Sequence, residues 1–193
     1  MIEQSVSLIP FPARNIPKIS ITGKISRKSN LLALHYSIAG NIEEIFIPLP
    51  SGHPMRNDEL WKTTCFEFFL AIKGRPQYWE FNMSSSGDWN VYRMEAYRRI
   101  GFREETSIRR IPLEIKKNAT DFVLDVAVDL NPIIQREQNL EIGVTAVIQT
   151  KDGNQTFWAL THPAPQADFH LRESFVLTVA GQTHLSQESS VAG

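Results

Sequence analysis

The amino-acid sequence predicts an all-β protein, an antiparallel β-sandwich of the jelly-roll-like kind. Three observations support this fold class. In most segments that show a pattern, apolar residues recur with a period of two rather than 3.6. Turn-forming residues such as glycine, proline, asparagine and serine recur about every 8–12 residues. No long amphipathic helix competes with these short segments, and no internal repeat is visible.

The predicted strands follow from these alternating segments and the turns between them. They cover residues 19–28, 31–40, 45–49, 64–72, 78–84, 89–98, 108–115, 121–130, 140–150, 155–160 and 174–179. The first two form a hairpin, because isoleucines alternate with polar residues up to a break at Ser29-Asn30. The proline-rich residues 48–58 form an ordered loop.

A few segments fit more than one kind of secondary structure. Residues 89–98 fit one face of a helix as well as one face of a strand, and the β-rich surroundings favour the strand. Residues 108–115 are expected to form an edge strand, because Pro112 interrupts them. Residues 131–138 begin with Asn-Pro, which predicts a turn or a single helical turn. The sequence Lys-Asp-Gly-Asn at 151–154 predicts a hairpin turn.

Composition limits the class of protein. With 193 residues we expect a single β-sandwich domain over residues 1–180 and a flexible tail over residues 181–193. Hydrophobic residues make up 42% and charged residues 21%, which is ordinary for a globular protein. The net charge of −1 gives no electrostatic reason to expect nucleic acid or an anionic membrane as a partner.

The sequence also predicts a cytoplasmic location. It contains no run of about 18 apolar residues that would form a transmembrane helix. The N-terminal segment lacks the positive start and the continuous apolar stretch of a secretory signal. The single cysteine, Cys65, cannot form an internal disulfide, which favours a reducing compartment. The oligomeric state stays open.

Catalytic signatures are mostly missing, so we do not expect an enzyme. The sequence has no glycine-rich phosphate or dinucleotide motif, no H-E-x-x-H and no C-x-x-C. The serines at 84–86 lack the flanking glycines of a nucleophile elbow and are typical of a turn. Cys65 would need His162 or His170 as a base, whereas a lone cysteine among apolar residues is usually a small buried side chain.

Histidines on two proline-rich loops suggest a metal site as an alternative. His162, Asp168 and His170 lie within nine residues on one loop, and His53 lies on another. Imidazole and carboxylate groups are common metal ligands. The simpler interpretation is that these side chains anchor their loops through hydrogen bonds.

The tryptophans suggest a site of another kind. Exposed aromatic rings stack on the apolar faces of sugar rings, while carboxylates, amides and guanidinium groups bind the hydroxyls. The residues of these types are Trp61, Trp79, Trp89 and Trp158, with Glu67, Asn82, Arg93 and His162 as polar partners. The competing interpretation is that all four tryptophans fill the core, each indole N–H finding a partner.

Glu67 and Glu80 each stand between aromatic residues of a predicted strand. If both faces of these strands are buried, each carboxylate is either paired or lines a cavity, because an unpaired buried charge is costly. Arg93, Arg98 or His162 could be a partner. A structural ion pair and a ligand contact are both open.

Three blocks of the sequence resemble bacterial DOMON-like proteins. That family is related to the family 9 carbohydrate-binding modules and, more distantly, to DOMON domains that bind haem or sugars. The blocks, in the expected order within residues 60–170, are LWKTTCFEFFL, YWEFNMSSSGDWNVYRMEAYR and ALTHPAPQADFH. The resemblance implies an antiparallel β-sandwich whose concave face or loop rim holds a ligand. In the sugar-binding relatives, aromatic residues clamp a terminal sugar and polar side chains bond its hydroxyls.

By this resemblance we expect a non-enzymatic protein that binds a carbohydrate or a similar polar small molecule. The expected ligand-binding residues are Trp61, Glu67, Asn82, Trp89 and Arg93, with His162 and His170 from an opposite loop. One alternative is a haem- or metal-binding domain, in which Met83 or Met94 would pair with His162. Another is a structural or interaction domain, which predicts four buried tryptophans and no polar-lined concavity. Haem and calcium are the cofactors that the resemblance allows, and neither is firmly expected, since no dense Asp/Asn loop is present.

Overall fold

The computed structural model describes residues 3–98 and 102–182, and it confirms the predicted all-β fold class. The strands in these residues are β1 (Glu3–Pro10), β2 (Ile19–Lys28), β3 (Leu31–Gly40), β4 (Cys65–Ile72), β5 (Tyr78–Ser84), β6 (Trp89–Met94), β7 (Arg103–Glu104), β8 (Leu113–Lys117), β9 (Asp121–Asp129), β10 (Leu140–Gln149), β11 (Gln155–Ala159) and β12 (Leu177–Val179). The same residues include the short 3-10 helices η1 (Ile42–Glu44), η2 (Leu60–Lys62) and η3 (Arg172–Ser174).

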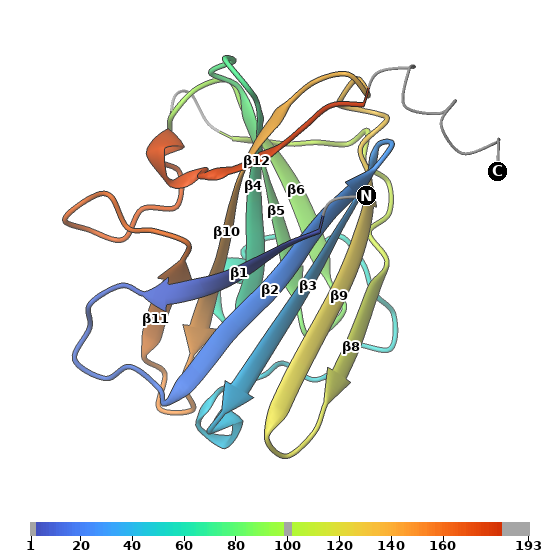
Figure 1. The fold of residues 1–193 in the computed structure, drawn as a ribbon. Helices are drawn as coiled ribbons and strands as arrows, with labels where there is room; N and C mark the ends of the chain where they lie inside the picture. The colour runs from blue at the N-terminus through green and yellow to red at the C-terminus, as the bar shows by residue number, and fades with distance from the viewer. Residues whose placement is uncertain (1–2, 99–101, 183–193) are drawn as a thin grey trace, which may run out of the picture.

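The strands form two antiparallel layers that face each other (Figure 1). The first sheet has the order β1-β2-β3-β9-β8, and the second has the order β7-β6-β5-β4-β10-β11, with β12 paired to the start of β10. Strand β1 belongs to both layers, because residues 3–8 pair with β2 and residues 9–10 pair with β11. The two sheets are therefore continuous along one side of the sandwich.

The core lies between the two sheets and is built from alternate residues of the facing strands. Phe66 of β4 stacks on Phe122 of β9, with ring centroids 5.1 Å apart, and so joins the layers. Phe68 stacks on its cross-strand partner Phe81 at 4.2 Å. These contacts arise because side chains two residues apart on a strand share a face.

Strands β4 and β5 are buried on both faces, not only on the face toward the core. A second apolar cluster covers the outer face of the second sheet, where Phe69 and Tyr78 pack against Phe175. A third cluster there includes Leu60, Cys65 and Val147. The segments before β4 and after β11 therefore fold over this face. This cover is what turns the outer face of the second sheet into an enclosed site.

Several predicted turns are confirmed. The β2–β3 hairpin turns at Ser29-Asn30, and Ser29 adopts a left-handed backbone with φ of 55°. The β10–β11 hairpin closes with an N–H···O bond of 2.8 Å from Thr150 to Asn154, and its Gly153 has a φ of 91° that favours glycine. Residues 131–138 form turns without a helix.

Four predicted strands differ from the structure by more than one residue. Within residues 45–49 only an isolated bridge from Ile45 to Thr150 forms. Strand β6 ends at Met94, after which the chain bends across the second sheet. Strand β8 begins directly after Pro112, because proline lacks the N–H that a ladder needs. Residues 174–176 precede β12 as the end of η3 and a short link.

Strand β1 was not predicted from the sequence. Of its eight residues only Leu8 is fully buried, so its apolar alternation is weak. Backbone pairing on both sides, with β2 and then with β11, holds it in place instead.

The single domain over residues 1–180 stays a prediction. Most of the predicted tail, residues 183–193, lies outside the described residues. Among the described residues, no helix is both long and apolar enough to cross a membrane.

Candidate functional site

A cavity of about 410 Å³ opens on the outer face of the second sheet. Its aromatic lining consists of Trp61, Phe69, Tyr92, Phe102, Phe157 and Phe169. Its polar lining consists of Glu67, Glu80, Arg98, Gln155, Asp168 and His170. A volume of this size is within the usual range for small-molecule sites.

Strand register explains how the polar floor is assembled. Glu67 of β4 lies opposite Asn82 of β5, and Phe69 lies opposite Glu80. Because alternate residues share a face, Glu67, Glu80 and Asn82 all lie on the outer side of the second sheet. Glu67 is 2% exposed and Asn82 is 0% exposed, so these two side chains are almost fully buried.

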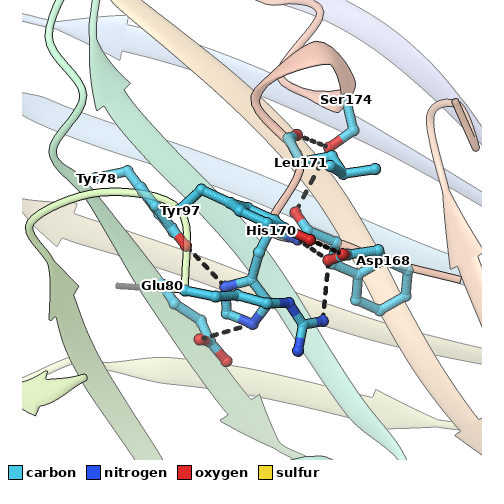
Figure 2. Close-up of polar contacts among 9 residues, drawn as sticks. Tyr78, Glu80, Tyr97, Asp168, His170, Leu171 and Ser174 are labelled. Carbon is cyan, nitrogen blue, oxygen red and sulfur yellow. Dashed lines mark hydrogen bonds and ion pairs between the residues drawn. The ribbon is translucent and has the colours of Figure 1, made fainter. Parts of the chain in front are cut away.

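A chain of polar contacts leads from the floor to the covering loop. The Asn82 amide donates to Glu80 Oε1 at 2.8 Å. Glu80 Oε2 lies 3.9 Å from His170 Nε2, and His170 Nδ1 lies 3.0 Å from the Tyr78 hydroxyl oxygen (Figure 2). The loop that follows β11 is thereby tied to β5.

Burial controls the protonation of this floor. Burial, followed by the nearby charge of Glu80, raises the pKa of Glu67 well above its usual range. Burial likewise raises the pKa of Glu80 to about 7. Burial, followed by the charge of Arg98, lowers the pKa of His170 to about 4. At neutral pH the Glu80–His170 contact therefore involves a neutral imidazole and is not a pair of opposite charges.

Asp168 fastens the rim of the cavity. It accepts hydrogen bonds from the Tyr97 hydroxyl at 2.6 Å and from the Arg98 guanidinium at 3.0 Å, which Figure 2 shows in part. It also accepts the backbone N–H of His170 at 3.0 Å. Burial opposes ionisation of Asp168, but the bonds from Tyr97 and Arg98 outweigh it and lower its pKa.

An aromatic wall stands beside the polar floor. Trp61, Tyr92 and Phe102 meet edge to face, with centroid distances of 5.7 Å from Trp61 to Tyr92 and 4.8 Å from Tyr92 to Phe102. Trp61 is half-buried and Phe102 is exposed. Both rings are thus in reach of a ligand in the cavity.

A second hollow, of about 500 Å³, lies on the outer face of the first sheet. Its polar lining includes the Lys24–Glu3 pair at 3.0 Å and the His35–Asp125 pair at 2.7 Å. These groups are exposed and already partnered, and no Phe, Tyr or Trp lines this hollow. We therefore take the cavity on the second sheet as the candidate site.

No protein-family model and no curated protein matches the chain. Solved structures do resemble it. One is a candidate carbohydrate-binding protein from Bacteroides uniformis, with a TM-score of 0.66, 14% identity, and coverage of 91% of this chain and 86% of the other. A family 9 carbohydrate-binding module from Caldicellulosiruptor kristjanssonii in complex with glucose has a TM-score of 0.53 and 11% identity, over 88% and 81% of the two chains. A structure of a module of this family from the same organism in complex with cellotriose has a TM-score of 0.57 and 10% identity, over 97% and 86%.

The chain has the β-sandwich fold of these modules. At 10–14% identity the likeness establishes the fold, as the resemblance of the three sequence blocks implied. The relation to DOMON domains and the bacterial source stay predictions.

The structure brings some of the predicted site residues together. Trp61, Glu67 and His170 line the cavity, and Asn82 lies beside Glu67 on the same face of the sheet without lining the cavity. Trp89 lies in the core between the sheets, with the Arg56 guanidinium 4.4 Å from its ring. This cavity therefore does not use Trp89 as a platform.

The two other predicted residues also lie elsewhere. Arg93 lines a separate hollow at the edge of the second sheet and lies 3.3 Å from Glu95. His162 donates from Nε2 to the Ile9 carbonyl at 2.9 Å and packs edge-on against Phe11. These contacts direct both side chains away from the cavity because their own partners hold them.

Several lining residues were missed by the sequence reasoning. Tyr92, Phe102, Gln155 and Phe157 line the cavity but were not proposed. The β4–β5 and β5–β6 registers would have indicated Tyr92, which lies opposite Glu80. Phe102 and Phe157 come from segments whose approach to β4 is tertiary, and no local pattern marks it.

Among the described residues, the side chains proposed for a metal site, a haem site or a nucleophile are not brought together. The described residues include no cluster of three or more His, Cys, Asp or Glu side chains placed to hold a metal ion. Met83 packs between the sheets, Met94 packs in the cluster with Phe175, and His162 is bound to the Ile9 carbonyl, so neither methionine forms an axial pair with His162. Cys65 is 0% exposed, and burial raises the pKa of its thiol.

Proposed function

We propose that the chain binds a carbohydrate, without transforming it, in the cavity on the outer face of the second sheet. One observation supports this most: the half-buried ring of Trp61 stands beside a buried floor of Glu67, Glu80 and Asn82. A sugar needs this combination, because its ring offers an apolar C–H face and a rim of hydroxyl groups. Aromatic rings cover such a face at low conformational cost, and carboxyl and amide groups form hydrogen bonds with the hydroxyls.

The fold also supports a carbohydrate ligand. The similar modules from Caldicellulosiruptor kristjanssonii were solved with glucose and with cellotriose. The structural or interaction alternative predicted four buried tryptophans and no polar-lined concavity. The structure differs on both points, because Trp61 is half-buried and borders a polar cavity.

Isothermal titration with glucose, xylose, cellobiose and cellotriose tests this proposal. Binding should release heat and change tryptophan fluorescence, because Trp61 borders the cavity whereas Trp79, Trp89 and Trp158 are buried. Trp61→Ala should lower the affinity by about tenfold or more, as expected for a central aromatic contact.

His162→Ala is the matched control, since it removes a half-buried ring that lies outside the cavity. It should leave the affinity within about twofold of the natural chain. Absence of heat with every sugar, together with unchanged fluorescence, would contradict the proposal.

A further inference from the structure

In and directly beside the floor of the cavity, two buried oxygen atoms have no hydrogen-bond partner among the described residues. Glu67 Oε1 and Asn82 Oδ1 are buried, and neither has a hydrogen-bond partner among the residues that the structure describes. The Asn82 side-chain amide already donates a hydrogen bond to Glu80 Oε1. Buried acceptors without a donor are costly, and in native proteins they commonly mark a place where another molecule supplies the donor.

The charges around the floor are also unbalanced. Three carboxyl groups line the cavity, those of Glu67, Glu80 and Asp168, whereas Arg98 is the cation among its lining residues. The Arg98 guanidinium donates a hydrogen bond of 3.0 Å to Asp168 Oδ1 and so already has a carboxylate partner. Arg98 also lowers the pKa of Glu80, and among the residues that the structure describes no second cation lines the cavity beside these two buried carboxyl groups.

The other titratable groups packed on this floor do not supply a positive charge. They are Cys65 on β4, Tyr78 on β5, Tyr92 on β6 and His170 on the covering loop, with Asp58 bonded to the Tyr92 hydroxyl. Because burial keeps the His170 imidazole neutral by lowering its pKa to about 4, it does not compensate the carboxylates at neutral pH.

We propose that the preferred ligand is an amino sugar, a polyhydroxylated ring whose primary ammonium group binds between the carboxyl groups of Glu67 and Glu80. This inference rests on the proposed carbohydrate function and names the class of sugar. An ammonium has three N–H donors and no acceptor, so it matches the carboxyl oxygens of the floor once these groups are ionised. It also supplies the charge that the two carboxylates lack, whereas a neutral hydroxyl supplies none.

Binding of such a ligand should release protons. Without a cation in the cavity the buried acids hold protons, since burial raises the pKa of both Glu67 and Glu80. An ammonium between them favours the ionised carboxylates, so the displaced protons pass to the buffer. A neutral sugar leaves the acids protonated and releases none.

Titration of the full chain at about pH 6 with glucose, glucosamine, N-acetylglucosamine and cyclohexylamine separates the sources of affinity. Glucosamine should bind about tenfold more tightly than glucose or N-acetylglucosamine, the size expected of one charge-assisted contact. Its binding enthalpy should vary with the ionisation enthalpy of the buffer, and that of glucose should not. Cyclohexylamine, which has the amine without the hydroxyls, should bind more weakly than glucosamine.

Substitutions test whether Glu67 and Glu80 cause the preference for glucosamine over glucose. Glu67→Gln and Glu80→Gln should each bring the ratio of glucosamine to glucose affinity toward one, and either variant suffices if the other does not fold. Glu114→Gln is the matched control, because it removes an exposed carboxylate on the first sheet, and it should keep the ratio.

The failures of the two proposals can be told apart. Equal affinity for glucose and glucosamine, without proton release, would overturn the amino-sugar preference and leave carbohydrate binding standing. Cyclohexylamine binding as tightly as glucosamine would also overturn it, because the hydroxyls would then contribute nothing. No binding of any sugar would overturn both.

Discussion

Cys65 and Glu67 stand two residues apart on β4, on the same outer side of the second sheet. Both side chains are buried beneath the covering loops, and Cys65 packs with Leu60 and Val147. For a thiol this placement removes reactivity, because the thiolate is the nucleophile and burial opposes its formation. For a carboxyl group at the edge of a cavity the same burial strengthens contacts with a ligand. A shift of two residues thus separates an inert side chain from one that lines the cavity.

Cys65 should therefore not react with a thiol reagent in the native protein. Burial and the nearby charge of Glu67 raise the pKa of the thiol, so almost no thiolate forms at neutral pH. We expect labelling only after unfolding in denaturant, followed by absorbance or mass spectrometry. Ser7→Cys in the same chain places a second thiol at an exposed position of β1 and should label at once. Rapid labelling of Cys65 in the folded chain would contradict its buried position.

Strand β1 connects the two sheets, and substitutions on its two faces can test its register. Leu8 points into the core and is 6% exposed, whereas the next residue, Ile9, is 50% exposed. Leu8→Ala should lower the free energy of unfolding by about 2–5 kcal/mol, the usual cost of truncating a buried leucine. Ile9→Ala is the matched control and should cost well under about 1 kcal/mol, because little apolar area leaves contact with the protein.

Urea denaturation measures both changes. Equal effects of the two substitutions would mean that β1 does not lie in the register described, since a shift by one residue would exchange the two side chains between core and solvent.

Much of the fold was predictable because period-two patterning is local. Strands β3 and β5 were predicted with the bounds that the structure has, since each is flanked by clear turn residues. Strand β1 was missed because an element held mainly by backbone pairing leaves little apolar signal. Residues 45–49 have alternating apolar residues but form no strand ladder, and Ile45 and Ile47 instead pack against the core.

The candidate site was less predictable because it depends on register and on loops. Glu67 was indicated by its place between aromatic residues, which is a local feature. That Asn82 and Glu80 share its face follows from pairing across the β4–β5 turn. Trp89 falls on the opposite face of the same sheet, and the residues alone left open which side of β6 faces the core. The partnership of Arg98 with Asp168 joins segments 70 residues apart, which no local pattern specifies.

For the whole molecule, the groups of the cavity tie stability to pH in two opposite directions. The folded pKa of Glu80 is raised from 4.5 to about 7, so its contribution is fully present below pH 4.5 and is lost as pH rises through 7. The folded pKa of His170 is lowered from 6.5 to about 4, so its contribution is present above pH 6.5 and is lost as pH falls through 4. These two groups alone would place the greatest free energy of unfolding between about pH 4.5 and 6.5, and Glu67, whose pKa burial also raises, adds a further decline as pH rises above 4.5.

Glu80→Gln should remove much of the decline on the alkaline side. Relative to the natural chain, the variant should gain stability between pH 4.5 and pH 8, by an amount on the order of 3 kcal/mol for a shift of this size. Urea denaturation at several pH values measures this difference, and comparing pH values cancels the constant cost of the altered contact with Asn82. Glu114→Gln, on the exposed face of the first sheet, serves as the control. If the profile of Glu80→Gln ran parallel to that of the natural chain, Glu80 would not be the group that holds a proton in the folded protein, and proton release from it on binding a cation would fail as well.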